Sequence, residues 1–315
     1  MLFEKKIIKM LLNKLIQYTH GHEKIIKKIE YIRGLYRYPS KMLGREFPSK
    51  YINNTDVLVF AAHPDDDVLG VGTTITRHSL NGENVKVVFV TNGTGRSGES
   101  WHLKVSESKK KSEIRYREAI QALSIINIPK ESIFCLGYPD GGTQRYIKNM
   151  SGDVQTLIQK LNPGRIYVHC IEGGHIDHDI TSFVVKSICN KIGYSNIFEW
   201  TEYNSIQPLG ALDVNFLSLQ SSNVKAVRID ISEEERILKR KMLACHNSQN
   251  VEQFYLQGET IRKAETSKLE MELFELCQFP KRKLKPIVKE FYKSMMAFYI
   301  WLRLIPSPIE IIEYL

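Results

Sequence analysis

Residues 56–67 read DVLVFAAHPDDD, and this stretch decides the fold. Its first seven residues are mostly apolar and rich in Val and Phe, which is typical of a strand buried on both faces. An imidazole and three carboxylates follow at once, at residues 63–67. In an open α/β sheet the loops after the strands form the ligand crevice, so this change from apolar to charged residues indicates a functional loop.

The same apolar pattern recurs along the chain. The runs that we predict as further strands are VKVVFVT (85–91), SIFCLG (132–137), RIYVHC (165–170), NIFEWTEY (196–203) and residues 224–231. Helical patterns lie at about 70–81, 106–127, 152–161 and 179–193, followed by 232–246 and 258–277. Regular alternation of strand and helix predicts an α/β fold, a Rossmann-like and mostly parallel sheet with helices on both faces. Helical N- and C-terminal appendages complete it.

We expect three regions: a basic amphipathic helical arm at 1–50, the α/β domain at 51–250 and a helical C-terminal extension at 251–315. The formal net charge is +9, but residues 1–50 hold 12 Lys and Arg against 4 Glu, and residues 281–315 hold 7 against 3. The balance is therefore +8 and +4 at the two ends and −3 between them. A nucleic-acid enzyme lines its working domain with cations, so this distribution argues against a nucleic-acid partner.

The two ends suggest contacts with an anionic surface. The first 20 residues space their apolar side chains on one helical face with lysines between them, which predicts a helix packed on the domain or lying on a membrane. The apolar segment 294–305 has 12 residues and contains Arg303, whereas a spanning helix needs roughly 20. Its aromatic residues suit a membrane interface, the body of the protein or a second subunit.

The five cysteines include no CxxC pair, which favours reduced thiols in a cytoplasmic protein. We therefore expect a cytoplasmic protein that is peripheral on the cytoplasmic face of the membrane if the basic arm and the apolar segment bind lipid.

Two more polar loops follow predicted strands. Residues 172–179 read EGGHIDHD and bring two imidazoles and several carboxylates to the edge of the sheet that carries residues 63–67. Since His nitrogen and Asp oxygen are ligands that zinc uses, the two clusters predict a divalent metal site. The third loop, TNGTGRSG at 91–98, offers amides and Arg96 to an anionic or sugar ligand. A dinucleotide is disfavoured because Gly70-Val71-Gly72 lacks the third glycine of the fingerprint.

At these residues the sequence resembles the PIG-L (LmbE-like) de-N-acetylase family, zinc hydrolases that remove acetyl from N-acetylglucosamine conjugates. The resemblance covers roughly residues 55–250. It consists of AHPDD at 62–66, TNG at 91–93, Arg115 with Glu118, GYPDG at 137–141, EGGHIDHD, and a weaker CHNSQ at 245–249. It implies that residues 51–250 are a deacetylase domain with zinc as its cofactor.

The resemblance also implies roles for individual residues. The implied zinc ligands are His63, Asp66 and His178. Asp65 would be the general base, and His175, held by Asp177, would stabilise the oxyanion. His175, or Asp65 returning its proton, would protonate the leaving amine.

Weaker predictions concern the substrate and neighbouring side chains. We predict Arg96, Arg115 and Glu172 as substrate-binding residues. Asp140 lies in a Pro-Asp-Gly segment that ordinarily sets a turn, and we expect His246 to be structural.

The sequence thus favours a zinc-dependent hydrolase that removes acetyl from an N-acetylated amino sugar, lipid- or nucleotide-linked. Two alternatives stay open: a zinc-dependent amide or ester hydrolase acting on a non-sugar metabolite, and a catalytically inactive membrane-associated binding module.

Overall fold

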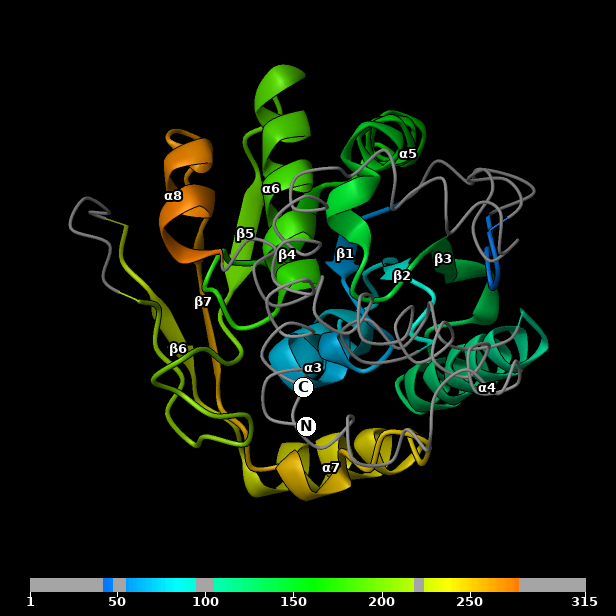
Figure 1. Ribbon diagram of the computed structural model, residues 1–315. Helices are drawn as coiled ribbons and strands as arrows, with labels where there is room; N and C mark the ends of the chain where they lie inside the picture. The colour runs from blue at the N-terminus through cyan, green and yellow to red at the C-terminus, as the bar shows by residue number, and fades with distance from the viewer. Residues whose placement is uncertain (1–41, 48–54, 95–104, 218–223, 278–315) are drawn as a thin grey trace, which may run out of the picture.

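The computed structural model describes residues 42–47, 55–94, 105–217 and 224–277. Within them a seven-stranded sheet has the order β3-β2-β1-β4-β5-β7-β6 (Figure 1). The strands are β1 (Val57–Ala61), β2 (Val85–Thr91), β3 (Ile133–Tyr138), β4 (Arg165–His169), β5 (Ile197–Trp200), β6 (Val227–Ile229) and β7 (Glu259–Lys263). Strands β1 to β5 pair in parallel, whereas β7 is antiparallel to both of its neighbours.

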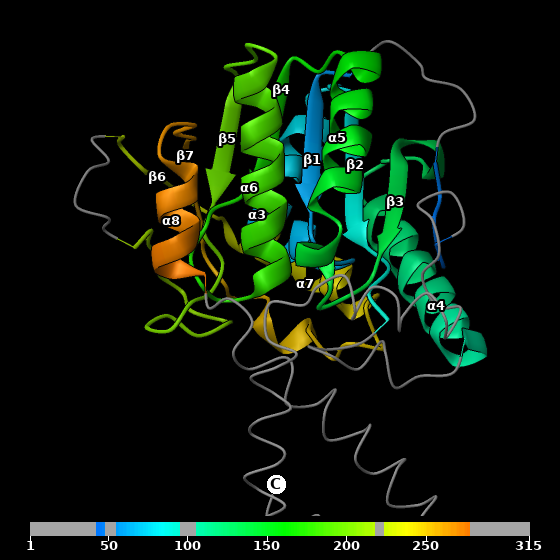
Figure 2. The same ribbon diagram turned by 45° about the horizontal axis from the view of Figure 1, so that its top comes forward.

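Helices cover both faces of the sheet (Figure 2). One face carries α5 (Ile147–Leu161), α6 (Ile176–Lys191) and α8 (Leu269–Leu276), and the other carries α3 (Asp66–Leu80), α4 (Val105–Ser124) and α7 (Glu233–Ala244). Successive strand residues point to opposite faces. In β1, Leu58 and Phe60 therefore join the core under α5 and α6, while Val57 and Val59 join the core under α3 and α4.

The strand order brings the two charged loops together. β1 pairs with β2 on one side and with β4 on the other, so the chain reverses its direction across the sheet at the β1–β4 pair. Ligands of open α/β sheets bind at such a switch point, outside the carboxyl ends of the strands. The loops after β1 and β4 carry residues 63–67 and 172–179, and they meet there.

The predicted fold class is confirmed, with one correction. The predicted helix at 258–277 is wrong in its first part, because residues 259–263 form β7 and only Leu269–Leu276 are helical. ETIRK has no clear strand pattern, but pairing with β5 and β6 on both sides satisfies its backbone and overrides its local preference.

The predicted terminal helices lie almost entirely outside the described residues. Of the predicted arm, only 42–47 is described, and it runs along the edge strand β3, where Glu46 and Cys135 form an antiparallel bridge. Among the described residues, no helix has the length and apolar character needed to cross a bilayer.

A buried ion pair between Lys239 and Glu259 fixes α3, the helix that begins in the charged loop after β1. The helix is kinked at Val71, which has non-helical φ and ψ of −141° and 22°. The Glu259 carboxylate of β7 accepts the backbone N–H groups of Thr73 (2.6 Å) and Thr74 (3.0 Å), which a continuous helix would bond internally. The Lys239 ammonium of α7 donates to the same carboxylate at 2.9 Å. β7 and α7 together therefore hold the bend in α3.

Candidate metal centre

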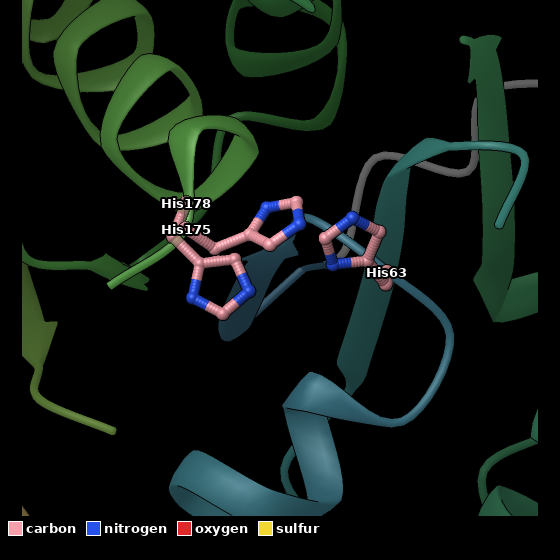
Figure 3. A group of neighbouring side chains, drawn as sticks. All are labelled: His63, His175 and His178. Carbon is pink, nitrogen blue, oxygen red and sulfur yellow. The ribbon is translucent and has the colours of Figure 1, made fainter. Parts of the chain in front are cut away.

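Three imidazoles converge where the loops after β1 and β4 meet. Figure 3 shows His63 on the loop after β1, facing His175 and His178 at the start of α6. The centroid of the His63 ring lies 4.7 Å from that of His175 and 5.4 Å from that of His178. The convergence predicted from the order of motifs is therefore present.

Asp66 lies close to two of these imidazoles, those of His63 and His178, and to a further one, that of His169. Its Oδ2 lies 3.1 Å from His63 Nδ1, 3.3 Å from His178 Nε2 and 3.4 Å from His169 Nε2. Two ligands of a tetrahedral zinc ion, each bound at about 2.0–2.1 Å, stand ~3.3 Å apart. Burial alone would raise the pKa of Asp66, but the imidazoles of His178 and His63 hold it well below its usual range. Asp66 is thus a charged oxygen donor at ligand spacing from its neighbours.

His178 gives an independent indication of a cation. Its imidazole is fully buried, and neither ring nitrogen makes a hydrogen bond of normal geometry to any described residue. Burial and the neighbouring His169 lower its pKa to about 4, so the ring is neutral and keeps a lone pair. A buried polar atom without a partner costs free energy, and a metal ion bound to His178 would give one of its ring nitrogens a partner. The residues present therefore fit a bound divalent ion.

The candidate donors form overlapping groups rather than one isolated triad. Within each group, donor atoms lie within 4.8 Å of one another. The groups are His63, His175 and His178; His63, Asp140, His175 and Asp177; and Asp66, His169 and His178.

Asp65 lies beside the donors in a strained backbone conformation. Its φ is 135°, which turns its carboxylate away from Asp66 and towards α4. Arg115 of α4 donates to Asp65 Oδ1 at 2.9 Å, to the Pro64 carbonyl at 2.8 Å and to the Gly93 carbonyl at 3.0 Å. Burial raises the pKa of Asp65 to about 7, with the Arg115 charge opposing the rise. Arg115, predicted to bind substrate, thus lies at the site with its guanidinium on the proposed base.

His175 is the N-cap of α6, and its Nδ1 accepts the backbone N–H of Asp177 at 3.2 Å. A neutral His175 therefore carries its proton on Nε2. The Asp177 carboxylate lies 3.8 Å from His175 Nδ1 and accepts the Gly141 N–H and the Thr143 hydroxyl (2.6 Å). Asp177 thus ties the start of α6 to the loop after β3.

Asp140 enters the site from that same loop. From the sequence we expected it only to set a turn, but its carboxylate lies 3.5 Å from His63 Nε2 and 3.8 Å from Arg115 Nη1, and it is buried. The available signal was its place directly after a predicted parallel strand, at the edge that carries the other polar loops.

The other two predicted substrate residues are placed differently. The buried Glu172 carboxylate accepts the Thr201 hydroxyl (2.6 Å), the Glu202 N–H (2.9 Å) and the Asn204 amide (3.3 Å). It therefore holds the loop after β5. Arg96 lies outside the described residues.

Comparison with known proteins points to one family. The model of the PIG-L family, described as GlcNAc-PI de-N-acetylase, matches residues 58–189, a range that includes all the candidate donors. No curated protein matches the chain.

Solved structures share the fold. A deacetylase of the teicoplanin biosynthetic pathway has a TM-score of 0.53 and 18% identity, over 66% of this chain and 97% of that one. The deacetylase of A40926 pseudoaglycone has a TM-score of 0.50 and 19% identity, over 63% and 84%. N,N'-diacetylchitobiose deacetylase from Pyrococcus horikoshii has a TM-score of 0.50 and 19% identity, over 82% and 96%.

The family match and the structure agree on one location. The matched segment begins in β1 and ends in α6, and the His and Asp donors of these elements form the metal-capable cluster. Residues 58–189 match the PIG-L family of de-N-acetylases, and they carry the cluster of side chains that can hold a metal ion.

Proposed function

We propose that the chain removes the acetyl group from an N-acetylated amino sugar, an N-acetylglucosamine-type conjugate linked to a lipid or a nucleotide, and that zinc is its metal. The carrying observation is the position of Asp65, a buried carboxylate fixed by Arg115 and adjacent in the chain to the donor Asp66. A site that only bound a ligand would not need a base beside a metal. The description of the matching family, GlcNAc-PI de-N-acetylase, supports the sugar.

His63, Asp66 and His178 would hold the ion. A bound zinc ion in such a site lowers the pKa of a water molecule towards ~7 and polarises a carbonyl. Asp65 takes a proton as the water oxygen attacks the acetyl carbon, since its pKa near 7 lets it alternate between base and acid around neutral pH. Arg115 keeps the carboxylate in one orientation through Oδ1.

His175 acts on the other side of the reacting carbonyl. Because its Nδ1 is engaged by the Asp177 N–H, its Nε2–H is the group that donates to the developing oxyanion. The amine leaves only when its nitrogen is protonated, and Asp65 returns the proton that it took. Asp177, bonded to Gly141 and Thr143, fixes the start of α6, where its backbone N–H donates to His175 Nδ1.

Acetate release from N-acetylglucosamine conjugates tests this function. We expect activity that chelator abolishes and zinc restores, and a loss of about 10²–10⁴-fold in Asp65→Asn, the usual contribution of a general base. His175→Ala should also be strongly impaired, whereas His78→Gln, at the opposite end of the sheet, should behave as wild type. Full activity in Asp65→Asn would refute the mechanism.

A panel of acetylated compounds tests the substrate class separately. Simple acetamides and esters are assayed beside N-acetylglucosamine linked to a lipid, to inositol phosphate and to a nucleotide. Preference for the sugar conjugates supports the proposal. Turnover of non-sugar amides or esters with no turnover of any sugar would overturn the substrate assignment while leaving the hydrolase intact.

We also propose that the enzyme works at the cytoplasmic face of a membrane. The support is in the sequence: +8 in residues 1–50 and an aromatic, apolar segment at 294–305. Flotation of the full chain with anionic vesicles, compared with neutral vesicles and with a charge-reduced variant of residues 5–14, tests this. Equal flotation in all three would count against it.

A further inference from the structure

His169 is a buried imidazole that the proposed chemistry does not use. It ends β4 with no solvent exposure, and its ring stacks on that of His178 with centroids 4.0 Å apart and planes at 23°. The ring centroid of Trp200 lies 4.3 Å from that of His169. Burying a polar imidazole costs free energy unless the imidazole is hydrogen-bonded. The contacts of His169 should therefore show what this buried side chain does.

The Nε2 atom of His169 reaches the loop that carries the metal donors. It accepts the backbone N–H of Ala62 at 3.1 Å and lies 3.4 Å from Asp66 Oδ2. Ala62 directly precedes His63. One imidazole thus touches the loop after β1 through its nitrogen and His178 of α6 through its ring face.

Glu202 lies behind His169, on the far side from the metal donors. It is fully buried, and its Oε2 lies 3.8 Å from His169 Nδ1 and accepts the Trp200 N–H at 3.4 Å. With Nε2 engaged as an acceptor, the His169 proton is on Nδ1, on the side of Glu202. At 3.8 Å the Glu202 carboxyl group makes no hydrogen bond to Nδ1, but an acceptor on this side of the ring favours the Nδ1–H tautomer electrostatically.

We propose that His169 is a positioning residue that fixes the relative place of the β1 loop and His178, with Glu202 setting its tautomer. It holds the Ala62 amide and supports the His178 ring, and so keeps Asp66 Oδ2 at ligand spacing from His63 and His178. The inference rests on the proposed metal site. His169 is not a ligand itself in this account, because the Ala62 N–H occupies the lone pair of Nε2.

Metal affinity of the full-length protein tests the proposal without an activity assay. Zn²⁺ and Co²⁺ affinities are measured by competition with a chromophoric chelator. His169→Leu, which fills the space but accepts no hydrogen bond, should bind metal about 10–100-fold more weakly, the usual effect of losing an outer partner. In His169→Gln the side-chain carbonyl can accept the Ala62 N–H, and the affinity should return to within a few-fold of wild type. His78→Leu is the matched control and should change nothing.

The Co²⁺ absorption spectrum separates positioning from ligation. A positioning role predicts that His169→Gln keeps the wild-type band positions and intensities. A changed spectrum together with no recovery of affinity in His169→Gln would make His169 a ligand and overturn the proposal. Wild-type affinity in His169→Leu would overturn it as well.

Two further results complete the test. If circular dichroism shows that His169→Leu does not fold, Glu202→Met is measured instead. Glu202→Met should bind metal several-fold more weakly than wild type. Wild-type metal affinity in Glu202→Met would refute the proposal. A wild-type protein that binds neither metal would refute the metal site, and with it the proposed function. Tight binding in both wild type and His169→Leu would refute only the role of His169.

Discussion

Replacing Arg115 by methionine should move the acid limb of the pH profile to higher pH. The pKa of Asp65 reflects burial, which raises it, and the Arg115 guanidinium 2.9 Å away, which lowers it. An opposite charge at this distance lowers a carboxyl pKa by about 1–3. Without it, Asp65 binds its proton more tightly and acts as a base only at higher pH. A bound metal shifts the absolute value in both proteins, so the difference between them keeps its sign.

The magnitude follows from the protonation equilibrium. Below the limb, the fraction of ionised base falls tenfold for each pH unit, so Arg115→Met should be at least ~10-fold slower there, and part of the loss should return in alkaline buffer. Arg115→Lys keeps the charge but can make only some of the three hydrogen bonds. Its acid limb should therefore lie between those of wild type and Arg115→Met. The readout is kcat/KM for acetate release against pH, with Arg117→Met, an exposed position on α4, as the control. An unshifted acid limb in Arg115→Met would show that Arg115 does not tune the base.

Three other perturbations test the supporting structure. Lys239→Met leaves the buried Glu259 charge without its cation and should lower the free energy of unfolding in urea by about 3–5 kcal/mol, with part regained in Lys239→Met/Glu259→Gln; a loss under about 1 kcal/mol would contradict the role of the pair. Burial lowers the pKa of His246 from 6.5 to about 3, so the unfolded chain binds the proton first and stability falls as pH drops through this window. Chemical unfolding of chelator-treated His246→Gln should show a shallower fall than wild type, and identical slopes would argue against a buried neutral imidazole. Thr143→Val removes the hydroxyl donor to Asp177 and should lower the free energy of unfolding, measured in the same way, by about 1.5–3 kcal/mol. An unchanged free energy of unfolding would show that this hydrogen bond is absent.

The sequence predicts the parallel part of the sheet well because those strands are buried on both faces. Runs such as VKVVFVT have a composition that solvent-exposed segments do not show, and the charged residues after them mark the carboxyl ends. The meeting of residues 63–67 with 172–179 then follows from a general property of open α/β sheets. The strand ETIRK could not be found in this way, because its burial comes from two neighbours far away in the chain.

Side-chain partners were harder to predict than the location of the site. Arg115 reads as a surface or substrate residue from sequence, and only the packing of α4 beside the β1 loop turns it onto Asp65. Glu172 follows a strand like the other acids, but it is used to hold the loop after β5. Asp140 is the opposite case, a turn residue whose carboxylate reaches His63. Such assignments depend on which loops are neighbours, and spacing along the chain does not contain that information.

Metal content tests the central claim that the loops after β1 and β4 form one metal site. Wild type, His63→Ala, Asp66→Ala and His178→Ala are purified without chelator, and bound metal is measured by elemental analysis alongside circular dichroism. We predict about one zinc ion per wild-type chain and a large loss of bound metal in each folded variant, because three protein ligands hold a catalytic zinc. Metal retained at the wild-type level in the variants from both loops, or absent from wild type supplied with zinc, would contradict the account.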